Sequence, residues 1–289
     1  MVTTLYRLIA KLPNYVRAFG ILHGLRLLLS MELRISENRE NCKLYQVPGY
    51  PCGIHLRQTI SDHAIFWQCL VLRQYDISIF PQSEKIRARY RELVAEGARP
   101  VIVDCGGNIG LSALYLAHQF PEAVVVVVEP DEENFEVLRK NTSGLGSRVV
   151  SLLGGVWHHG GRLRIVNPES GSAAFRVESV GLDSLEGVDA YTIDDICRRV
   201  DAEAPLIAKI DVEGAQMQLF SENTDWVQRT SLIMLELDDW RLPWQGTSQS
   251  FFSCVSSYPF DYLLSGETIF CFRHLEEKSG ARYDFDRTG

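Results

Sequence analysis

The stretch PVIVDCGGNIGLSALYLAHQF, residues 100–120, joins a predicted strand to a predicted helix through a loop that is rich in glycine. Its first part, PVIVD, is apolar up to Asp104, which is typical of a short strand covered on both faces. Gly106, Gly107 and Gly110 let the backbone of the loop come close to a ligand at the start of the helix. A buried strand, a glycine-rich loop and a helix in this order predict one unit of a parallel α/β sheet.

The alternation of strand and helix continues along the chain after this unit. Four more strands are expected, at residues 123–129, 148–154, 205–211 and 231–237. Residues 259–275 differ, since they predict two strands joined by a tight turn. We therefore expect an α/β fold with a doubly wound, mostly parallel, seven-stranded sheet of Rossmann-like type that ends in an antiparallel hairpin.

The chain ahead of the first glycine-rich unit has a different pattern. Residues 15–31 predict one amphipathic helix, and residues 33–60 predict short strands broken by proline and glycine. Ser61 and Asp62 are suited to cap a further helix.

We divide the chain into an N-terminal extension, residues 1–75, and a main domain, residues 76–289. The amphipathic helix is expected to pack on the main domain or on a second subunit of a homo-oligomer. The alternative is peripheral contact with a membrane surface, since basic and apolar residues mix in this helix.

The composition limits where the chain works and what it binds. Its net charge is −8, which argues against nucleic acid as a partner, although residues 1–36 by themselves carry +4. No stretch approaches the roughly 20 apolar residues of a transmembrane segment. The seven cysteines include no CxxC pair, and we expect reduced thiols in a cytoplasmic protein.

Acidic residues stand at the ends of four predicted strands. They are Asp104, Glu129, Asp211 and Glu236. The carboxyl ends of parallel strands share one edge of the sheet, which is where ligands bind in this class of fold. Four carboxylates at one edge would repel one another unless a cation or a hydroxyl-rich ligand lay among them.

The glycine-rich loop narrows the choice of ligand. It lacks the G-x-G-x-x-G spacing of a dinucleotide fingerprint, and Asp104 directly before the glycines would repel a pyrophosphate. A cofactor without phosphates that carries an amino-acid moiety suits this loop better. Glu129 follows Gly110 by 19 residues and ends the second strand, where it can accept hydrogen bonds from two ribose hydroxyls.

Four blocks of the sequence together resemble a known family. The strings VIVDCGGNIG (101–110), VVEPDEENFEVLRKN (127–141) and LIAKIDVEGAQ (206–216) are similar to the hallmark blocks of the FkbM family of methyltransferases. The string IHLRQTISDHAIF (54–66) resembles the segment that precedes them in the family. The resemblance implies a class I methyltransferase fold, S-adenosylmethionine as cofactor, and O-methylation of a hydroxyl on a small molecule such as a sugar, glycan or polyketide.

Position in these blocks and at the sheet edge assigns roles to individual residues. Asp211 and Glu213 are expected at the reaction centre. The expected cofactor-binding residues are Asp104, Gly106, Gly107, Asn108, Gly110, Glu129, Pro130 and Asn134.

A general base would assist methyl transfer, because a sugar hydroxyl is a poor nucleophile until its proton is removed. Glu213, just past the fourth strand, is the first candidate and Asp211 is the second. His158 and His159 follow as the third, and the acceptor wall is expected within residues 155–204.

The site is expected to work without a metal ion. The alternative is Mg²⁺ between Asp211 and the pair Asp238–Asp239, whose oxygens would suit this cation. Two other functions stay open at this point. One is an NAD-dependent oxidoreductase, which would share Glu129, and the other is a non-catalytic interaction protein that binds S-adenosylmethionine.

Overall fold

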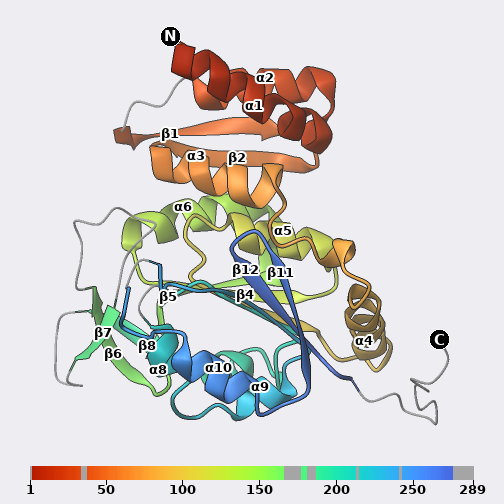
Figure 1. Ribbon diagram of the computed structural model, residues 1–289, viewed down its shortest axis with the longest axis vertical. Coiled ribbons are helices and arrows are strands. Elements are labelled where there is room, and N and C mark those ends of the chain that lie inside the picture. The colour runs from red at the N-terminus through yellow and green to blue at the C-terminus, as the bar shows by residue number, and fades with distance from the viewer. Residues whose placement is uncertain are drawn as a thin grey trace.

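The computed structural model describes residues 2–33, 38–165, 177–180, 187–212, 215–240 and 243–275. In this part of the chain a large sheet lies between two layers of helices, and the N-terminal extension stands on one of these layers (Figure 1).

Seven strands form the centre of the sheet, in the order β5-β4-β3-β9-β10-β12-β11. The five from β5 to β10 are parallel, and β12 runs antiparallel to both of its neighbours. Their bounds are β3 Val101–Cys105, β4 Val124–Glu129, β5 Val149–Val156, β9 Ile207–Ile210, β10 Leu232–Glu236, β11 Phe260–Ser265 and β12 Thr268–Arg273. The predicted parallel sheet with a terminal hairpin is confirmed.

Three further strands extend the sheet beyond β5, so that it has ten strands in the described residues rather than seven. They are β8 (Val188–Tyr191), β6 (Gly161–Ile165) and β7 (Val177–Val180). Each is only four or five residues long and none is a continuous apolar run, which is why the sequence did not predict them. Residues 166–176 and 181–186 of the expected acceptor wall lie outside the described residues.

Alternate residues of the central strands point into two separate cores. Val125 and Val127 of β4 belong to the core that also contains residues of α5 and α6, whereas Val126 belongs to the core on the opposite face. The first face carries α4 (Ser83–Ala95), α5 (Leu111–Gln119) and α6 (Glu132–Thr142). The second carries α7 (Ile193–Arg198), α8 (Gln216–Leu219), α9 (Asp225–Arg229) and α10 (Gln249–Val255).

The extension is a small layered unit that packs onto α5 and α6 (Figure 1). Its core residues Tyr15, Leu28 and Phe66 join the same hydrophobic cluster as Val125 of the main sheet. Its elements are α1 (Val2–Phe19), α2 (Ile21–Glu32), the antiparallel pair β1 (Asn38–Val47) and β2 (Tyr50–Gln58), and α3 (Ile60–Phe66). A π-helical turn η1 (Trp67–Val71) and a 3₁₀ turn η2 (Ile77–Ile79) lead toward α4.

Two details of the extension differ from the prediction. The single helix expected over residues 15–31 is broken at Gly20, whose φ of 78° lies in the left-handed region that glycine adopts without strain. The cap of α3 is Thr59, whose side chain accepts a hydrogen bond from the Asp62 backbone amide. Ser61 and Asp62 do not cap this helix, because it begins at Ile60 and both residues lie within its first turn.

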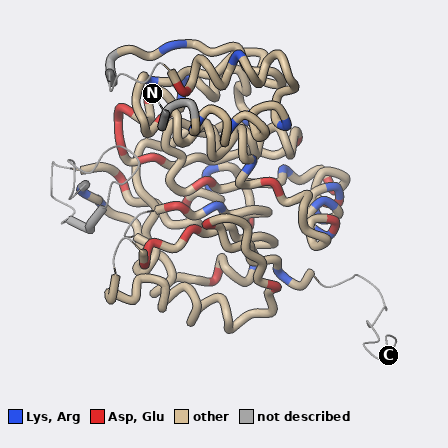
Figure 2. Tube along the Cα trace, turned by 45° about the horizontal axis from the view of Figure 1, so that its top comes forward, with Lys and Arg blue, Asp and Glu red and all other residues tan. Residues whose placement is uncertain are grey.

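The outer surface of α1 and α2 exposes large apolar side chains, among them Tyr6, Ile9, Leu22 and Leu25. Lys and Arg are spread along these helices, whereas Asp and Glu are frequent in the body of the main domain (Figure 2). Of the helices within the described ranges, none combines the length and apolar character needed to cross a bilayer.

Candidate active site at the carboxyl edge of the sheet

A buried lysine lies among the carboxylates at the edge of the sheet. Lys209 of β9 is the direct neighbour of Asp104 of β3 in the register of the two strands. Its Nζ lies 3.1 Å from Asp104 Oδ1 and 3.3 Å from Asp211 Oδ2, and it donates to the Gly106 carbonyl at 2.8 Å. Burial disfavours the ammonium charge, but the nearby carboxylates outweigh burial and raise the pKa of Lys209 above its usual value. Lys209 therefore supplies part of the positive charge that the clustered carboxylates require.

Asp104 points into the interior of the protein. Its side chain is fully buried, and Oδ2 accepts a hydrogen bond of 2.5 Å from the hydroxyl of Ser112 in α5. With Lys209 on its other oxygen, the carboxylate ties β3 to β9 and to the first turn of α5. These contacts give Asp104 a structural role. A contact between Asp104 and the cofactor stays a prediction.

The glycines of the loop are required by close packing. A Cβ atom on Gly106 would lie 2.0 Å from the backbone oxygen of Asp211, and the φ of Gly106 is +81°. A Cβ atom on Gly107 would lie 2.1 Å from a methyl group of Val127. The backbone of the loop is thus packed against Asp211, directly after β9, and against β4, and Gly110, with φ of +83°, leads into α5.

Glu129 ends β4 with a buried side chain that the loop and α6 surround. Its Oε2 accepts from the Asn108 backbone amide at 2.7 Å, and Oε1 accepts from Asp131 N at 3.1 Å and Asn134 Nδ2 at 3.3 Å. Burial raises the pKa of Glu129 to about 7, although these hydrogen bonds oppose the shift. A carboxylate offers about four acceptor positions, and the described residues use three of them, which leaves one toward which a ligand hydroxyl could donate. Pro130, which follows, is partly exposed.

Arg57 of the extension contacts Glu129 indirectly, through the side chain of Asn134. One of its terminal nitrogens donates to Asn134 Oδ1 at 2.6 Å and lies 2.8 Å from Asp62 Oδ1, and the side chain is almost fully buried. Asn134 therefore bridges Arg57 and Glu129, which is a bracing role that the sequence did not predict. The available signal was the segment IHLRQTISDHAIF, which contains both Arg57 and Asp62.

The two remaining acids lie side by side at the ends of β9 and β10. Leu235 pairs with Ile210, so Glu236 and Asp211 follow on adjacent strands. Glu236 Oε1 accepts from Gln74 Nε2 at 2.5 Å and from the Tyr75 hydroxyl at 3.0 Å. Burial, with the charge of Asp211 as a smaller contribution, raises the pKa of Glu236 to about 8.

The other candidates for the general base either lie outside the described residues or have contacts away from the sheet edge. Glu213, the first candidate for the base, lies outside the described residues. His158 Nδ1 is 3.6 Å from a carboxylate oxygen of Glu222. Within the described ranges, no group of three or more His, Cys, Asp or Glu side chains is arranged to hold a metal ion. Magnesium at Asp211 and Asp238–Asp239 stays an untested alternative.

The sequence profile of the family described as "Methyltransferase FkbM domain" matches residues 104–252, about half of the chain. The chain belongs to the FkbM methyltransferase family. Membership implies S-adenosylmethionine as the methyl donor. The strand order and terminal hairpin described above are those of a class I methyltransferase fold.

Two curated methyltransferases are similar to this FkbM chain. The hexuronic acid methyltransferase AglP of Haloferax volcanii is 22% identical over 138 residues, which are 47% of this chain and 55% of that protein. The methyltransferase sdnD of Sordaria araneosa is 41% identical over 44 residues, 15% of this chain and 17% of that protein. The chain thus spans about half the length of AglP, 55%, and a smaller part of sdnD, 17%.

Solved methyltransferase structures align with the chain at low similarity. Monomeric WbdD aligns with a TM-score of 0.38 and 14% identity, over 72% of this chain and 43% of that one. The precorrin-6y C5,15-methyltransferase of Geobacter metallireducens aligns with a TM-score of 0.32 and 11% identity, over 68% of this chain and 88% of that one.

Proposed function

We propose that this FkbM-family chain transfers a methyl group from S-adenosylmethionine to a hydroxyl oxygen of a polar small molecule. The observation that carries the proposal is the pair of carboxyl groups, Asp211 and Glu236, at adjacent strand ends on the sheet edge where Glu129 also lies. The name of AglP, a hexuronic acid methyltransferase, supports a carbohydrate as the acceptor.

Glu129 is the residue proposed to hold the cofactor. Its carboxylate is fixed by Asn108, Asp131 and Asn134, so that its orientation does not have to be established when the ribose binds. Gly106 and Asn108 place the loop backbone beside it, where it can contact the amino-acid end of S-adenosylmethionine. The donor supplies an electrophilic methyl group, and the protein's contribution is to hold the acceptor oxygen in line with that group.

Removal of the hydroxyl proton falls to a carboxylate near Asp211. Glu213 is the first candidate because it follows β9 by three residues, and Asp211 is the second. A neutral Glu236 beside Asp211 avoids repulsion between the two groups, and Lys209 at 3.3 Å from Asp211 offsets the negative charge that remains.

The test is methyl transfer from donor labelled in its methyl group to glucose, glucuronate and other hydroxylated acceptors, with the position of the methyl found by NMR. Glu213→Gln should lower turnover by roughly 10²–10⁴-fold while S-adenosylhomocysteine binds as before. Glu92→Gln, a substitution at an exposed carboxylate of α4, serves as the control.

Methyl on nitrogen or carbon would overturn the proposed O-methylation. Binding of NAD in place of S-adenosylhomocysteine in calorimetry would favour the oxidoreductase. Tight binding of S-adenosylhomocysteine without turnover on any acceptor would favour the non-catalytic alternative.

A further inference from the structure

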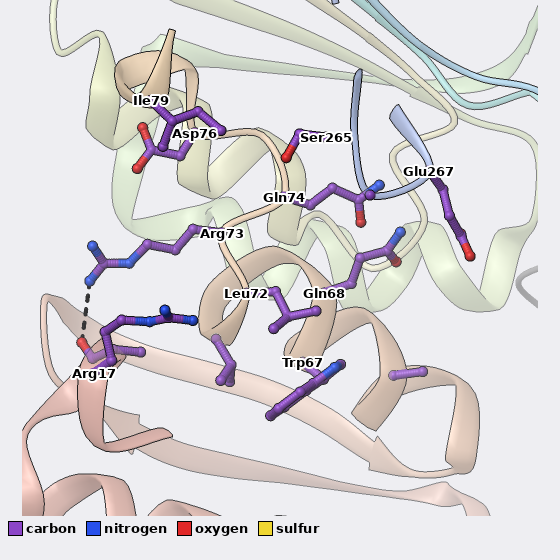
Figure 3. A pocket seen from close by; sticks show the side chains of 14 residues that line it. Arg17, Trp67, Gln68, Leu72, Arg73, Gln74, Asp76, Ile79, Ser265 and Glu267 are labelled. Carbon is purple, nitrogen blue, oxygen red and sulfur yellow. Dashed lines mark hydrogen bonds between the residues drawn. The ribbon is translucent and has the colours of Figure 1, made fainter. Parts of the chain in front are cut away.

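A cavity of about 900 Å³ separates the extension from the tip of the terminal hairpin. Its walls come from the end of α1, from η1 and the chain that follows it to η2, and from the turn between β11 and β12 (Figure 3). No single one of these elements could form it, and the extension contributes most of the side chains.

One side of the cavity adjoins the proposed reaction edge. Gln68 and Gln74 line the cavity, and the amide nitrogens of both lie within hydrogen-bond distance of Glu236 Oε1, at 3.5 Å and 2.5 Å. Gln74 also donates to the Thr268 hydroxyl at 2.7 Å, which fixes its amide between β10 and β12. A molecule in the cavity would therefore contact the side chains that hold Glu236, next to Asp211.

Two arginines stand at another part of the wall. Arg17 comes from the end of α1 and Arg73 from the chain after η1, and Figure 3 shows the two side chains near each other. Within the described residues, the hydrogen-bond partners found for them are neutral. Arg17 donates to the side-chain oxygen of Asn14, and Arg73 donates to the backbone oxygen of Ala18 at 3.2 Å. A pair of guanidinium groups with neutral partners beside a cavity is suited to bind an anion.

The acids that line the cavity are placed differently. The Asp76 carboxylate accepts a hydrogen bond from the Ser78 amide at 2.9 Å, where it begins η2. Glu267 is exposed at the tip of the hairpin, and Figure 3 shows it on the opposite side from the arginines. Figure 3 shows Asp76 on the same side of the cavity as Arg17 and Arg73, so that side carries two guanidinium groups and one carboxylate and is positive on balance. The amides of Gln68 and Gln74 lie toward Glu267. This arrangement suits a ligand with an anionic group toward the arginines and hydroxyls toward the amides.

We propose that this cavity is the acceptor site and that it takes a hydroxylated molecule bearing a carboxylate or a phosphate, which Arg17 and Arg73 bind. The proposal rests on the function proposed above, because it gives that methyltransferase its acceptor class. The hydroxyl to be methylated then lies toward Gln68, Gln74 and Glu236.

The experiment uses calorimetry on the full chain with three probes: glucuronate, glucose 1-phosphate and glucose. At least one anionic sugar should bind about 10-fold or more tightly than glucose, since its anionic group gains charge-assisted hydrogen bonds to the two arginines. Arg17→Met and Arg73→Met should each remove most of this preference. Arg139→Met is the matched control, because Arg139 lies on α6 in an exposed ion pair with Glu136. The stronger of the two anionic probes identifies carboxylate or phosphate as the recognised group.

Two results would overturn the inference. One is equal affinity for all three probes, and the other is a preference that survives in both arginine variants while their circular dichroism matches that of the parent. S-adenosylhomocysteine is titrated on the same samples, so the two proposals fail separately. Cofactor binding without anion preference removes only the acceptor site, whereas anion preference without cofactor binding or methyl transfer removes the proposed function and the acceptor role together.

Discussion

At Glu129, burial sets the protonation of the carboxyl group on which the proposed cofactor binding depends. Because its pKa is raised to about 7, a substantial fraction of the side chain is protonated at neutral pH, and a protonated carboxyl is a poorer acceptor for ribose hydroxyls. We expect the affinity for S-adenosylhomocysteine to rise with pH through 7, by up to about tenfold per pH unit below that value. Calorimetry from about pH 5.5 to about pH 8.5, which is about 1.5 units on either side of this pKa, measures the change in affinity.

Substitution of Glu129 separates the carboxylate from other effects of pH. Glu129→Ala should weaken binding by about 2–4 kcal/mol, and Glu129→Gln should bind weakly with little dependence on pH. A parent protein whose affinity is constant over this range would show that Glu129 does not hold the ribose.

Glu236 should make the protein less stable as pH rises. Its folded pKa of about 8 exceeds the usual 4.5, so between these values the folded state binds more protons than the unfolded state. The free energy of unfolding therefore falls as pH increases across this window, by an amount on the order of a few kcal/mol. Glu236→Gln should flatten the decline, whereas Glu122→Gln, at an exposed position before β4, should leave it unchanged. Urea unfolding at pH 5 and pH 8.5, conditions close to the two ends of the window, provides the comparison.

The sequence predicted the acids of the site better than their partners. Asp104, Glu129 and Asp211 are recognisable because each stands at the end of an apolar run or one residue beyond it. Lys209 was missed although it stands two residues before Asp211, where alternation along a strand puts both on one face. Arg57 was missed because its contact with Asn134 joins residues 77 positions apart, and no local pattern marks such a pair.

At the scale of elements, the loop after β3 depends on the absence of a side chain at Gly106. Alanine there would place Cβ 2.0 Å from the Asp211 oxygen and would have to adopt a φ of +81°. We expect Gly106→Ala to lower the free energy of unfolding by more than about 2 kcal/mol, since backbone atoms cannot move away as a flexible side chain could. Gly97→Ala is the control, because its φ is similarly +77° but no atom lies within 4 Å of the added carbon.

Both variants bear the free-energy cost of a positive φ at alanine. The difference between their free energies of unfolding therefore measures the contact with Asp211. Chemical denaturation of both proteins gives this difference directly. Equal destabilisation would mean that the loop moves away from β9 without cost.

Element prediction succeeded where one signal dominated. Long apolar runs predicted β3, β4 and β10. The short strands β6 and β8 carry no such run, and their pairing depends on each other and on β5. The break at Gly20 was missed because apolar spacing continues across it, while the left-handed turn depends on backbone conformation.

At the scale of the whole molecule, one hydrophobic cluster runs from α1 through α3 to the central strands. The boundary assigned between residues 75 and 76 stays a prediction, but a shared core of this kind favours cooperative unfolding of both parts. Arg57 is the polar counterpart of this contact, since it joins Asp62 in the extension to Asn134 in α6.

Arg57→Met should therefore affect a site that it does not touch. It leaves Asp62 buried without its cation, which we expect to cost about 3–5 kcal/mol of stability. It also releases Asn134 from one side, so the affinity for S-adenosylhomocysteine should fall. Arg89→Met, which removes an exposed ion pair with Glu92, is the control. Thermal unfolding and calorimetry on the same preparations measure both quantities, and an unchanged cofactor affinity in a folded Arg57→Met protein would contradict the bracing role.

The bridge from Arg57 through Asn134 to Glu129 also constrains how this protein can be recombined with its relatives. An exchange of residues 38–79 alone would bring a foreign cavity wall, but it would also replace Arg57, which braces Glu129 through Asn134. A chimera built to change acceptor preference should therefore carry Arg57, Asp62 and Asn134 as one inherited set, with the crossover points placed so that none of the three is exchanged without the others.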